Sequence, residues 1–187
     1  MPRRLRILIY SVLLTLALYM YWVSGQQLVS EQAPVKTGAV LIDPLNPSGS
    51  LNVKRGALTS VYEKVPFNLK FDYIPLADGR SRVVGRSKDG STVIELVGPP
   101  EGVTSINLMA SLSDEHPLIR LKNLNAILFL IEVTLADWAG APAWVVSNID
   151  EAFAGNGATT SANGKAISIS VAPQTQTLVV TIIGPPL

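Results

Sequence analysis

The chain has 187 residues, of which 48% are hydrophobic and 16% are charged, and its formal net charge is +1. This length predicts one main domain, and the charged fraction, against roughly 25% in an average soluble domain, favours contact with a membrane or a covered partner surface. The absence of cysteine excludes disulfides, thiolate metal sites and thiol catalysis.

The positive charge balance comes from the beginning of the chain. Arg3, Arg4 and Arg6 lie there, and no acidic residue precedes Ser24. Without these three arginines, 12 of the 15 basic residues remain against 14 acidic ones, a net charge of −2. Because the rest of the chain is slightly acidic, we predict no nucleic-acid partner.

The first 27 residues have the organisation of a membrane-targeting segment. A basic start, residues 1–6, precedes residues 7–23, which contain no charge. These 17 residues exceed a signal-peptide core of about 7 to 15 residues and reach the lower limit of about 17 for a spanning helix. We therefore predict a transmembrane anchor at residues 7–23 that contacts the membrane. Its predicted interface residues are Arg3, Arg4 and Arg6 on the cytoplasmic side and Tyr19, Tyr21 and Trp22 on the other.

The anchor predicts a single-pass protein of a bacterial inner membrane, with a cytoplasmic N-terminus and a periplasmic or extracellular domain. The Asn46-Pro47-Ser48 triplet has the proline that prevents N-glycosylation, and it gives no support to a eukaryotic secretory setting. The alternative is cleavage near Gly25, where small residues follow the apolar run, and secretion of the remainder.

Residues 24–55 are predicted to form a tether. Prolines and glycines are scattered among polar residues, and residues 39–42 form the one short apolar run. The alternative is an extended arm that packs on the domain, because loops of this length are uncommon without a role. The domain itself is predicted at residues 56–187.

The first part of this domain has the pattern of β-strands. We predict strands at residues 57–65, 80–88, 91–98 and 103–111, with a type I′ hairpin turn at Asp89-Gly90. This turn would pair Val83 with Leu96 and place Ile94 on the same, core-facing side. Arg82, Arg86 and Lys88 would then lie on the opposite face with Glu95 and Val97. This basic patch is a candidate anion site, with an ordinary solvated sheet face as the alternative.

Two helices are predicted in the middle of the domain. The first begins near Ser113 with acidic residues and Pro117 and continues to about Trp138, and the second spans residues 143–153. The buried seam of the first helix is predicted at Leu121, Leu124, Leu128, Ile131, Leu135 and Trp138. Apolar residues also lie off this seam, so we expect the helix to be buried on most sides. Arg120, Lys122, Glu132 and Asp137 argue against a second membrane span.

The chain ends with strands predicted at residues 159–162, 165–171 and 177–183, and with a type I′ turn at Asn163-Gly164. Together the elements have the approximate order β-β-β-α-α-β-β. This order predicts an α+β fold in which one long and one short helix lie on one face of an antiparallel sheet.

Catalytic and metal-binding patterns are not found in the sequence. His116, the one histidine, lies beside Asp114 and Glu115, but adjacent residues at a helix start point in different directions. Glu132 and Asp137 are five residues apart on the predicted helix and do not converge. No nucleophile elbow or phosphate-binding loop is present. We predict no enzyme activity, no metal and no cofactor.

Trp138 and Trp144 flank the break between the two predicted helices. They close the core or, alternatively, line a ligand cleft. The first functional hypothesis is a non-enzymatic interaction or assembly module, with a protein partner or a second copy bound at excess apolar surface. The second is an exported module that binds a small apolar or anionic ligand near the tryptophans. The third, a hydrolase, requires His116 near a serine or carboxylate in an open pocket. The candidate partner or ligand surface consists of Trp138, Trp144, Phe129 and Leu130.

Overall fold

The computed structural model of the chain describes residues 49–113, 115–172 and 174–185. The predicted basic start, the anchor with its interface residues, the cleavage position and residues 24–48 of the tether lie outside these residues. No helix in the described part of the chain is long and apolar enough to cross a membrane.

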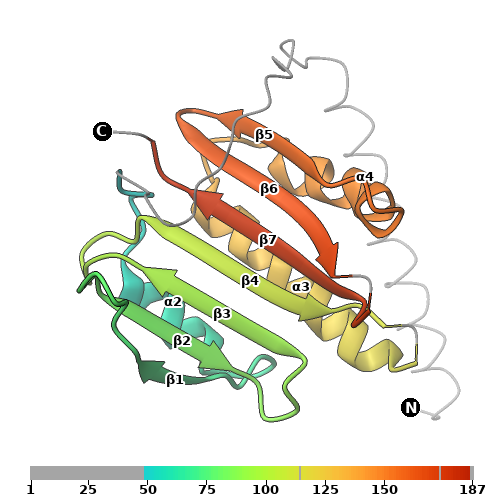
Figure 1. Cartoon of the computed structure of the whole chain (residues 1–187), viewed down its shortest axis with the longest axis horizontal. Coiled ribbons are helices and arrows are strands. Elements are labelled where there is room, and N and C mark those ends of the chain that lie inside the picture. The colour runs from blue at the N-terminus through green and yellow to red at the C-terminus, as the bar shows by residue number, and fades with distance from the viewer. Residues whose placement is uncertain (1–48, 114, 173, 186–187) are drawn as a thin grey trace, which may run out of the picture. The chain divides into compact units, whose positions relative to one another are not determined.

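The described residues contain an antiparallel sheet of seven strands in the order β1-β2-β3-β4-β7-β6-β5 (Figure 1). Two meanders, β1 to β4 and β5 to β7, are joined where β4 pairs with β7. The strand bounds are β1 Lys70–Tyr73, β2 Arg82–Arg86, β3 Thr92–Val97, β4 Ser105–Ser111, β5 Ala158–Ala162, β6 Lys165–Ala172 and β7 Thr177–Ile183.

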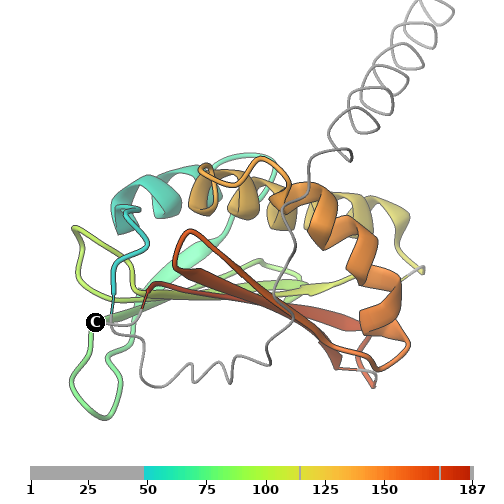
Figure 2. The ribbon, with the colours of Figure 1, turned by 90° about the horizontal axis from the view of Figure 1, so that it is seen from above.

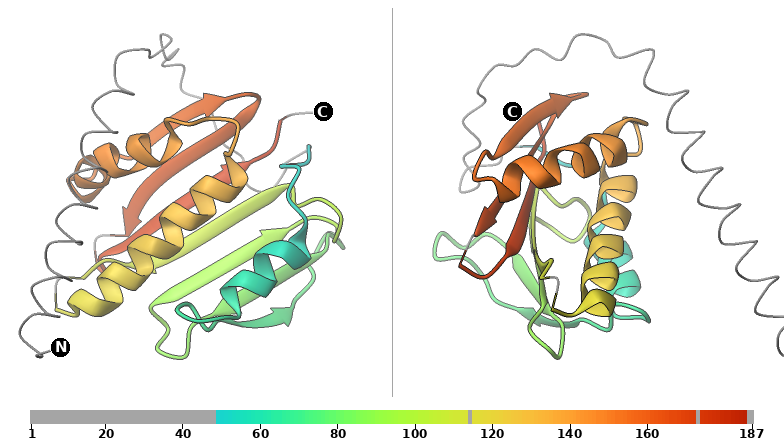
Figure 3. Two further views of the ribbon diagram at one scale, coloured as in Figure 1. Left: turned by 180° about the vertical axis from the view of Figure 1, so that it is seen from behind. Right: turned by 90° about the vertical axis from the view of Figure 1, so that its right-hand side faces the viewer.

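Three helices of the described chain lie on one face of this sheet: α2 (Arg55–Tyr62), α3 (Pro117–Thr134) and α4 (Ala141–Phe153). Figures 2 and 3 show all of them on the same side, with α3 running along the middle of the sheet. The predicted α+β class with helices on one face of an antiparallel sheet is confirmed. The approximate order β-β-β-α-α-β-β is corrected, because α2 precedes the first strand, four strands come before α3 and three follow α4.

Residues 57–65 are not the predicted strand, because most of them belong to α2. The β-branched and aromatic residues of this segment favoured a strand, but Leu58 and Tyr62 are spaced four apart and both are buried on one helical face. The Tyr62 hydroxyl donates a hydrogen bond of 2.7 Å to the Ala126 carbonyl of α3. Tertiary packing of these two residues therefore overrides the local strand preference.

The two predicted hairpins differ in their turns. Asn163 and Gly164 have φ values of 53° and 77° and connect the paired residues Ala162 and Lys165, which confirms the type I′ turn. At the first hairpin the predicted pairing of Val83 with Leu96 is confirmed. The type I′ turn predicted at Asp89-Gly90 is wrong. The Gly90 N–H donates a hydrogen bond to the Ser87 carbonyl, and a longer loop replaces the predicted two-residue turn.

The predicted seam of α3 is confirmed in part, because Ile131 and Leu135 are buried and Leu124 and Trp138 pack against the core. The helix ends at Thr134, its buried residues are Asn123, Ala126, Ile127, Leu130, Ile131 and Thr134, and Leu121 is 56% exposed. A helix that is apolar all round gives no periodic signal that identifies the buried side. Among residues 126–134 of α3 only Glu132 is exposed, as expected for a helix buried on most sides, whereas Leu118 and Leu121 in its first half are exposed.

The core lies between the helices and the sheet. Ile94, Leu108, Val180 and Ile169 form a row across β3, β4, β7 and β6, and each is at most 1% exposed. Burial of one such side chain contributes roughly 1.5–3 kcal/mol. This continuous apolar face fixes the central strands and so positions both ends of the sheet.

Residues 49–53, the start of the described chain, pack against the domain. Leu51 is fully buried in the core, and its N–H donates to the Val103 carbonyl at 2.8 Å. The Val103 N–H in turn donates to the Val53 carbonyl at 3.0 Å. The end of the predicted tether range, 24–55, is therefore part of the folded domain.

Candidate partner-binding site

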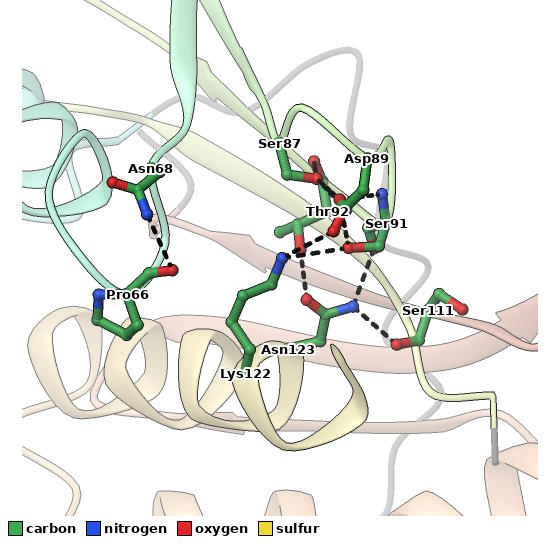
Figure 4. A network of polar contacts seen from close by, with 9 residues as sticks. All are labelled: Pro66, Asn68, Ser87, Asp89, Ser91, Thr92, Ser111, Lys122 and Asn123. Atoms are coloured by element: carbon green, nitrogen blue, oxygen red, sulfur yellow. Dashed lines mark hydrogen bonds and ion pairs between the residues drawn. The ribbon is translucent and has the colours of Figure 1, made fainter. Parts of the chain in front are cut away.

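The candidate site lies where the loop between β2 and β3 meets the first half of α3. This hairpin loop, residues 87–92, is organised around the carboxylate of Asp89 (Figure 4). Asp89 Oδ1 accepts hydrogen bonds from the hydroxyls of Ser87 (2.6 Å) and Ser91 (2.8 Å) and from the Ser91 N–H (3.0 Å). The loop is therefore held by its own side chains.

Lys122 of α3 attaches this loop to the helix. Its Nζ lies 3.1 Å from Asp89 Oδ2, and Figure 4 shows the lysine reaching from the helix toward the loop. The pKa of Asp89 is lowered well below its ordinary value, first by the Ser87 hydroxyl and then, against some desolvation, by Ser91 and Lys122. Asp89 is therefore ionised at neutral pH and links the hairpin loop to the helix.

Asn123 forms a second, fully buried connection beneath this ion pair. Its Oδ1 accepts a hydrogen bond of 2.6 Å from the Thr92 hydroxyl, and its Nδ2 donates to the carbonyls of Ser91 (3.1 Å) and Ser111 (2.8 Å). Asn123 is 0% exposed and Thr92 is 2% exposed. Because both polar atoms of the Asn123 amide have hydrogen-bond partners, the first half of α3 is fixed to the beginning of β3 and the end of β4.

The opposite side of α3 carries two exposed leucines. Leu118 is 83% exposed and Leu121 is 56% exposed. Residues two positions apart differ by about 200° around a helix, so Leu121 lies nearly opposite Asn123. The polar network that fixes the inner side of α3 therefore presents an apolar surface on the outer side.

Two hollows flank Asp89 at this end of the molecule. One has a volume of about 410 Å³, and its lining includes Ser91, Ser113, His116 and Ile119. The other has a volume of about 490 Å³, and its lining includes Phe67, Asn68, Lys88 and Lys122. Neither hollow is lined by Leu118 or Leu121.

The open hollow at His116 meets the positional requirement of the hydrolase hypothesis, since serines and Asp89 also line it. The required chemistry is not assembled. The Ser91 hydroxyl donates to Asp89, and Lys122 already pairs with that carboxylate. No hydrogen bond joins His116 to another side chain of the described residues, so no nucleophile is paired with a base.

The predicted tryptophan pair lies elsewhere. Trp138 and Trp144 have ring centroids 6.0 Å apart, and both are half-buried against the core. Trp138 Nε1 also lies close to Gly140, where a Cβ atom would be 3.1 Å away. Neither tryptophan lines the two hollows beside Asp89.

The other two residues of the predicted partner surface point inward. Leu130 is fully buried, and Phe129 is half-buried in an aromatic cluster with Tyr62 and Phe67. The ring of Phe129 lies 5.7 Å from that of Tyr62, edge to face. The structure therefore brings Trp138 and Trp144 together and gives Phe129 and Leu130 packing roles in the core.

The predicted basic patch is divided among different partners. Arg82 lies 2.7 Å from Glu95 Oε1 and also donates to the Ile74 carbonyl, and Arg86 lies 3.7 Å from Asp72. Lys88 is exposed in the hairpin loop. Because carboxylates accompany both arginines, the three cations do not converge on one anion site.

Metal binding has no candidate in the described residues, where no group of three or more histidine, cysteine or acidic side chains could hold an ion. No protein-family model, curated protein or solved structure matches the chain.

Sequence reasoning did not select Leu118 or Asn123. The spacing of Asn123, Ile127, Leu130 and Thr134 could have identified the buried side of α3 and hence its exposed leucines.

Proposed function

We propose that the chain is a membrane-anchored protein of the bacterial envelope whose external domain is a non-enzymatic interaction module. The anchor at residues 7–23 places the domain, and the first half of α3 binds a protein partner. The observation that carries this proposal is the exposure of Leu118 and Leu121, at 83% and 56%, on a helix whose other side is fixed.

The rigid support of these leucines favours a binding role. Asp89, Lys122 and Asn123 hold this part of α3 in place, so little conformational entropy is lost when a partner covers it. Polar and charged residues, among them His116 and Arg120, adjoin the leucines along the helix. An apolar centre with a polar rim is the usual anatomy of a protein interface.

The test is purification of the full-length chain from the membranes of its native host in mild detergent. We expect a stoichiometric companion, either a second copy or another protein. Substitution of both Leu118→Ser and Leu121→Ser should weaken this association by about tenfold or more, or roughly 1.4 kcal/mol. Tyr73→Ser is the matched control, because Tyr73 is 62% exposed on β1 and lies outside the site. A chain that remains alone, or a double variant that associates like the control, would contradict the proposal.

The alternative function is an exported module that binds a small apolar or anionic ligand near Trp138 and Trp144. Their adjacency, with ring centroids 6.0 Å apart, makes intrinsic fluorescence a direct probe of this region. Titration with an apolar dye and with inorganic phosphate should leave the emission unchanged if the interaction module is correct. A saturable change that is lost in Trp144→Phe would favour the alternative.

A further inference from the structure

The two edge strands of the sheet differ in their side chains. β1 carries Lys70 and Asp72, and Asp72 lies 3.7 Å from Arg86 of β2. β5, Ala158–Ala162, has the sequence ATTSA, which contains no charge and no proline. Figure 1 shows it as the last strand on its side of the sheet, and no further strand of the described residues pairs with it. Charged side chains and proline are among the features that keep a strand edge from pairing with another chain, and β5 has neither.

The hairpin turn decides which backbone groups of β5 face outward. Ala162 and Lys165 flank the two-residue turn, and such a pair exchanges both of its hydrogen bonds. Bonded and non-bonded pairs alternate along an antiparallel ladder. Thr160 is therefore bonded to β6, whereas Thr159 and Ser161 direct their N–H and C=O groups away from it. Both residues are exposed, so the outer edge offers their donors and acceptors symmetrically about Thr160.

We propose that β5 pairs with β5 of a second copy of the chain, so that one sheet continues through both molecules. Antiparallel pairing about a two-fold axis at Thr160 places Thr159 opposite the partner's Ser161, and Ser161 opposite the partner's Thr159. Each of these pairs exchanges backbone hydrogen bonds in both directions. Because the strand has no charge, it presents no like charges to its own copy. The strand is thus complementary to itself.

The helix layer leaves room for this pairing. Among the strands, α4 packs mainly on β6, one strand in from the edge, and Figure 3 shows it over that side of the sheet. Three strand spacings, about 14 Å, then separate the two copies of α4, whereas packed helices need only about 8–10 Å. The two-fold axis makes these helices antiparallel. Asp150 and Glu151, near the end of α4, therefore lie beside the uncharged first half of the partner's helix.

The tryptophan pair lies beside the same hairpin. Trp138 follows Asp137, whose carbonyl accepts a hydrogen bond of 2.9 Å from Asn163 in the turn. In the proposed register Asn163 lies opposite the partner's Gly157, which has no side chain to obstruct the approach. Trp138 and Trp144 are half-buried within one copy, and we expect the second copy to cover them further. This contact adds apolar area to the strand pairing.

The β5 edge is separate from the leucine surface. Leu118 and Leu121 are on α3, which runs along the middle of the sheet, whereas β5 is at its edge (Figures 1 and 3). Both leucines stay exposed when β5 pairs with its copy, so the dimer can still bind a further protein there. The dimer therefore does not depend on the function proposed above.

The first test places proline where the backbone N–H faces away from the sheet. Ser161→Pro removes an outward donor of β5 in each copy and leaves the bonds to β6 in place. Tyr73→Pro is the matched control on β1. Because the Ile74 N–H donates to the Arg82 carbonyl at 3.0 Å, the Tyr73 N–H faces away from β2. In sedimentation of the full-length chain in mild detergent, wild type and Tyr73→Pro should be dimers. Ser161→Pro should raise the dimer dissociation constant about thirtyfold, or roughly 2 kcal/mol.

A monomeric wild-type chain would overturn the inference, and so would equal association of the two proline variants. The remaining outcome separates this inference from the proposed function. A dimer that survives Ser161→Pro but is lost in the Leu118→Ser, Leu121→Ser double variant would place the second copy on α3. That result would overturn the pairing of β5 and support the partner site.

The second test examines the register of the two strands. The chain has no cysteine, so a single introduced cysteine can form a disulfide only with its copy. Thr160→Cys lies at the two-fold axis in a non-bonded pair, where the Cα atoms are about 4.5 Å apart, within the range that a disulfide spans. Mild oxidation of the full-length chain should convert it to a covalent dimer on a non-reducing gel. Tyr73→Cys, at the other edge, is the control. Its cross-linking as efficiently as Thr160→Cys, or the absence of a Thr160→Cys dimer, would contradict the pairing.

Discussion

Two polar networks are attached to β3, and they differ in what covers them. At its beginning Thr92 joins Asn123 under α3, and both residues are almost completely buried. In its middle Glu95 joins Arg82 and Asn107 on the open face, where the Arg82 and Glu95 side chains are 25% and 21% exposed. Both networks are well paired, but water can replace a lost partner only in the second.

This difference decides what each network contributes. A buried polar atom that loses its partner retains its full desolvation cost, whereas a partly exposed one is solvated again. The buried network therefore fixes how α3 is placed and which leucines it exposes. The open network pairs Arg82 of β2 with Glu95 of β3 on a partly solvated face, and its loss should leave the fold intact.

The largest effect is expected for Asn123→Ala. The substitution leaves the Thr92 hydroxyl and two carbonyls without their partner and opens a small cavity, so the free energy of unfolding should fall by about 2–4 kcal/mol. Denaturant unfolding measures this change. Asn125→Ala, on the exposed side of the same helix, should change stability by less than about 0.5 kcal/mol. Equal effects of the two substitutions would contradict the assigned role of Asn123.

A smaller effect is expected for Tyr62→Phe, which removes one buried contact instead of three. Burial raises the pKa of the Tyr62 phenol above its ordinary value, and the hydroxyl donates to the Ala126 carbonyl. Loss of this bond should cost about 1–1.5 kcal/mol in thermal or denaturant unfolding. Tyr73→Phe, at an exposed tyrosine, is the control and should be nearly neutral. A loss of unfolding free energy as large as that for Asn123→Ala would contradict the expectation that the loss grows with the number of buried hydrogen bonds removed.

The sequence predicted the features that are decided within a few residues. Asn163 and Gly164 accept positive φ values at low cost, so their turn and the pairing of β5 with β6 followed directly. The pairing of Val83 with Leu96 was also predicted, because the longer loop preserves the register of the shorter one. The same register identified the core face of β3, which carries Ile94 and Leu96.

Features that depend on distant contacts were not predicted. The helix α2 is held by Tyr62 against α3, a contact between residues 64 positions apart that local preference does not reveal. In α3 a polar residue, Asn123, faces the core while Leu118 and Leu121 face outward, the reverse of the usual pattern. The candidate site was missed for the same reason, because its exposed leucines lie on the side of α3 where polar residues are expected.

Substitution of Asp89 should change stability by an intermediate amount. The residue adjoins the buried network, but its own side chain is 41% exposed. Its lowered pKa means that the ionised form stabilises the fold above the unfolded pKa of about 3.9, and that this stability is lost as the pH falls through the lower, folded value. Asp89→Asn should therefore reduce stability by about 0.5–1 kcal/mol at neutral pH, a figure discounted for solvent screening.

The difference between wild type and Asp89→Asn should shrink as the pH is lowered below about 4. Denaturant unfolding at a series of pH values measures it. A difference that stays constant from neutral pH down to about 2 would show that the carboxylate charge is not responsible.

The smallest effect is expected in the open network. Arg82→Met and Glu95→Gln, measured singly and together, should give a coupling free energy of about 0.5 kcal/mol, because both side chains keep access to water. High salt should reduce this coupling further, since screening acts on exposed charges. A coupling near that of a buried pair, about 3 kcal/mol or more, would contradict the assignment of this ion pair to an open, solvated face.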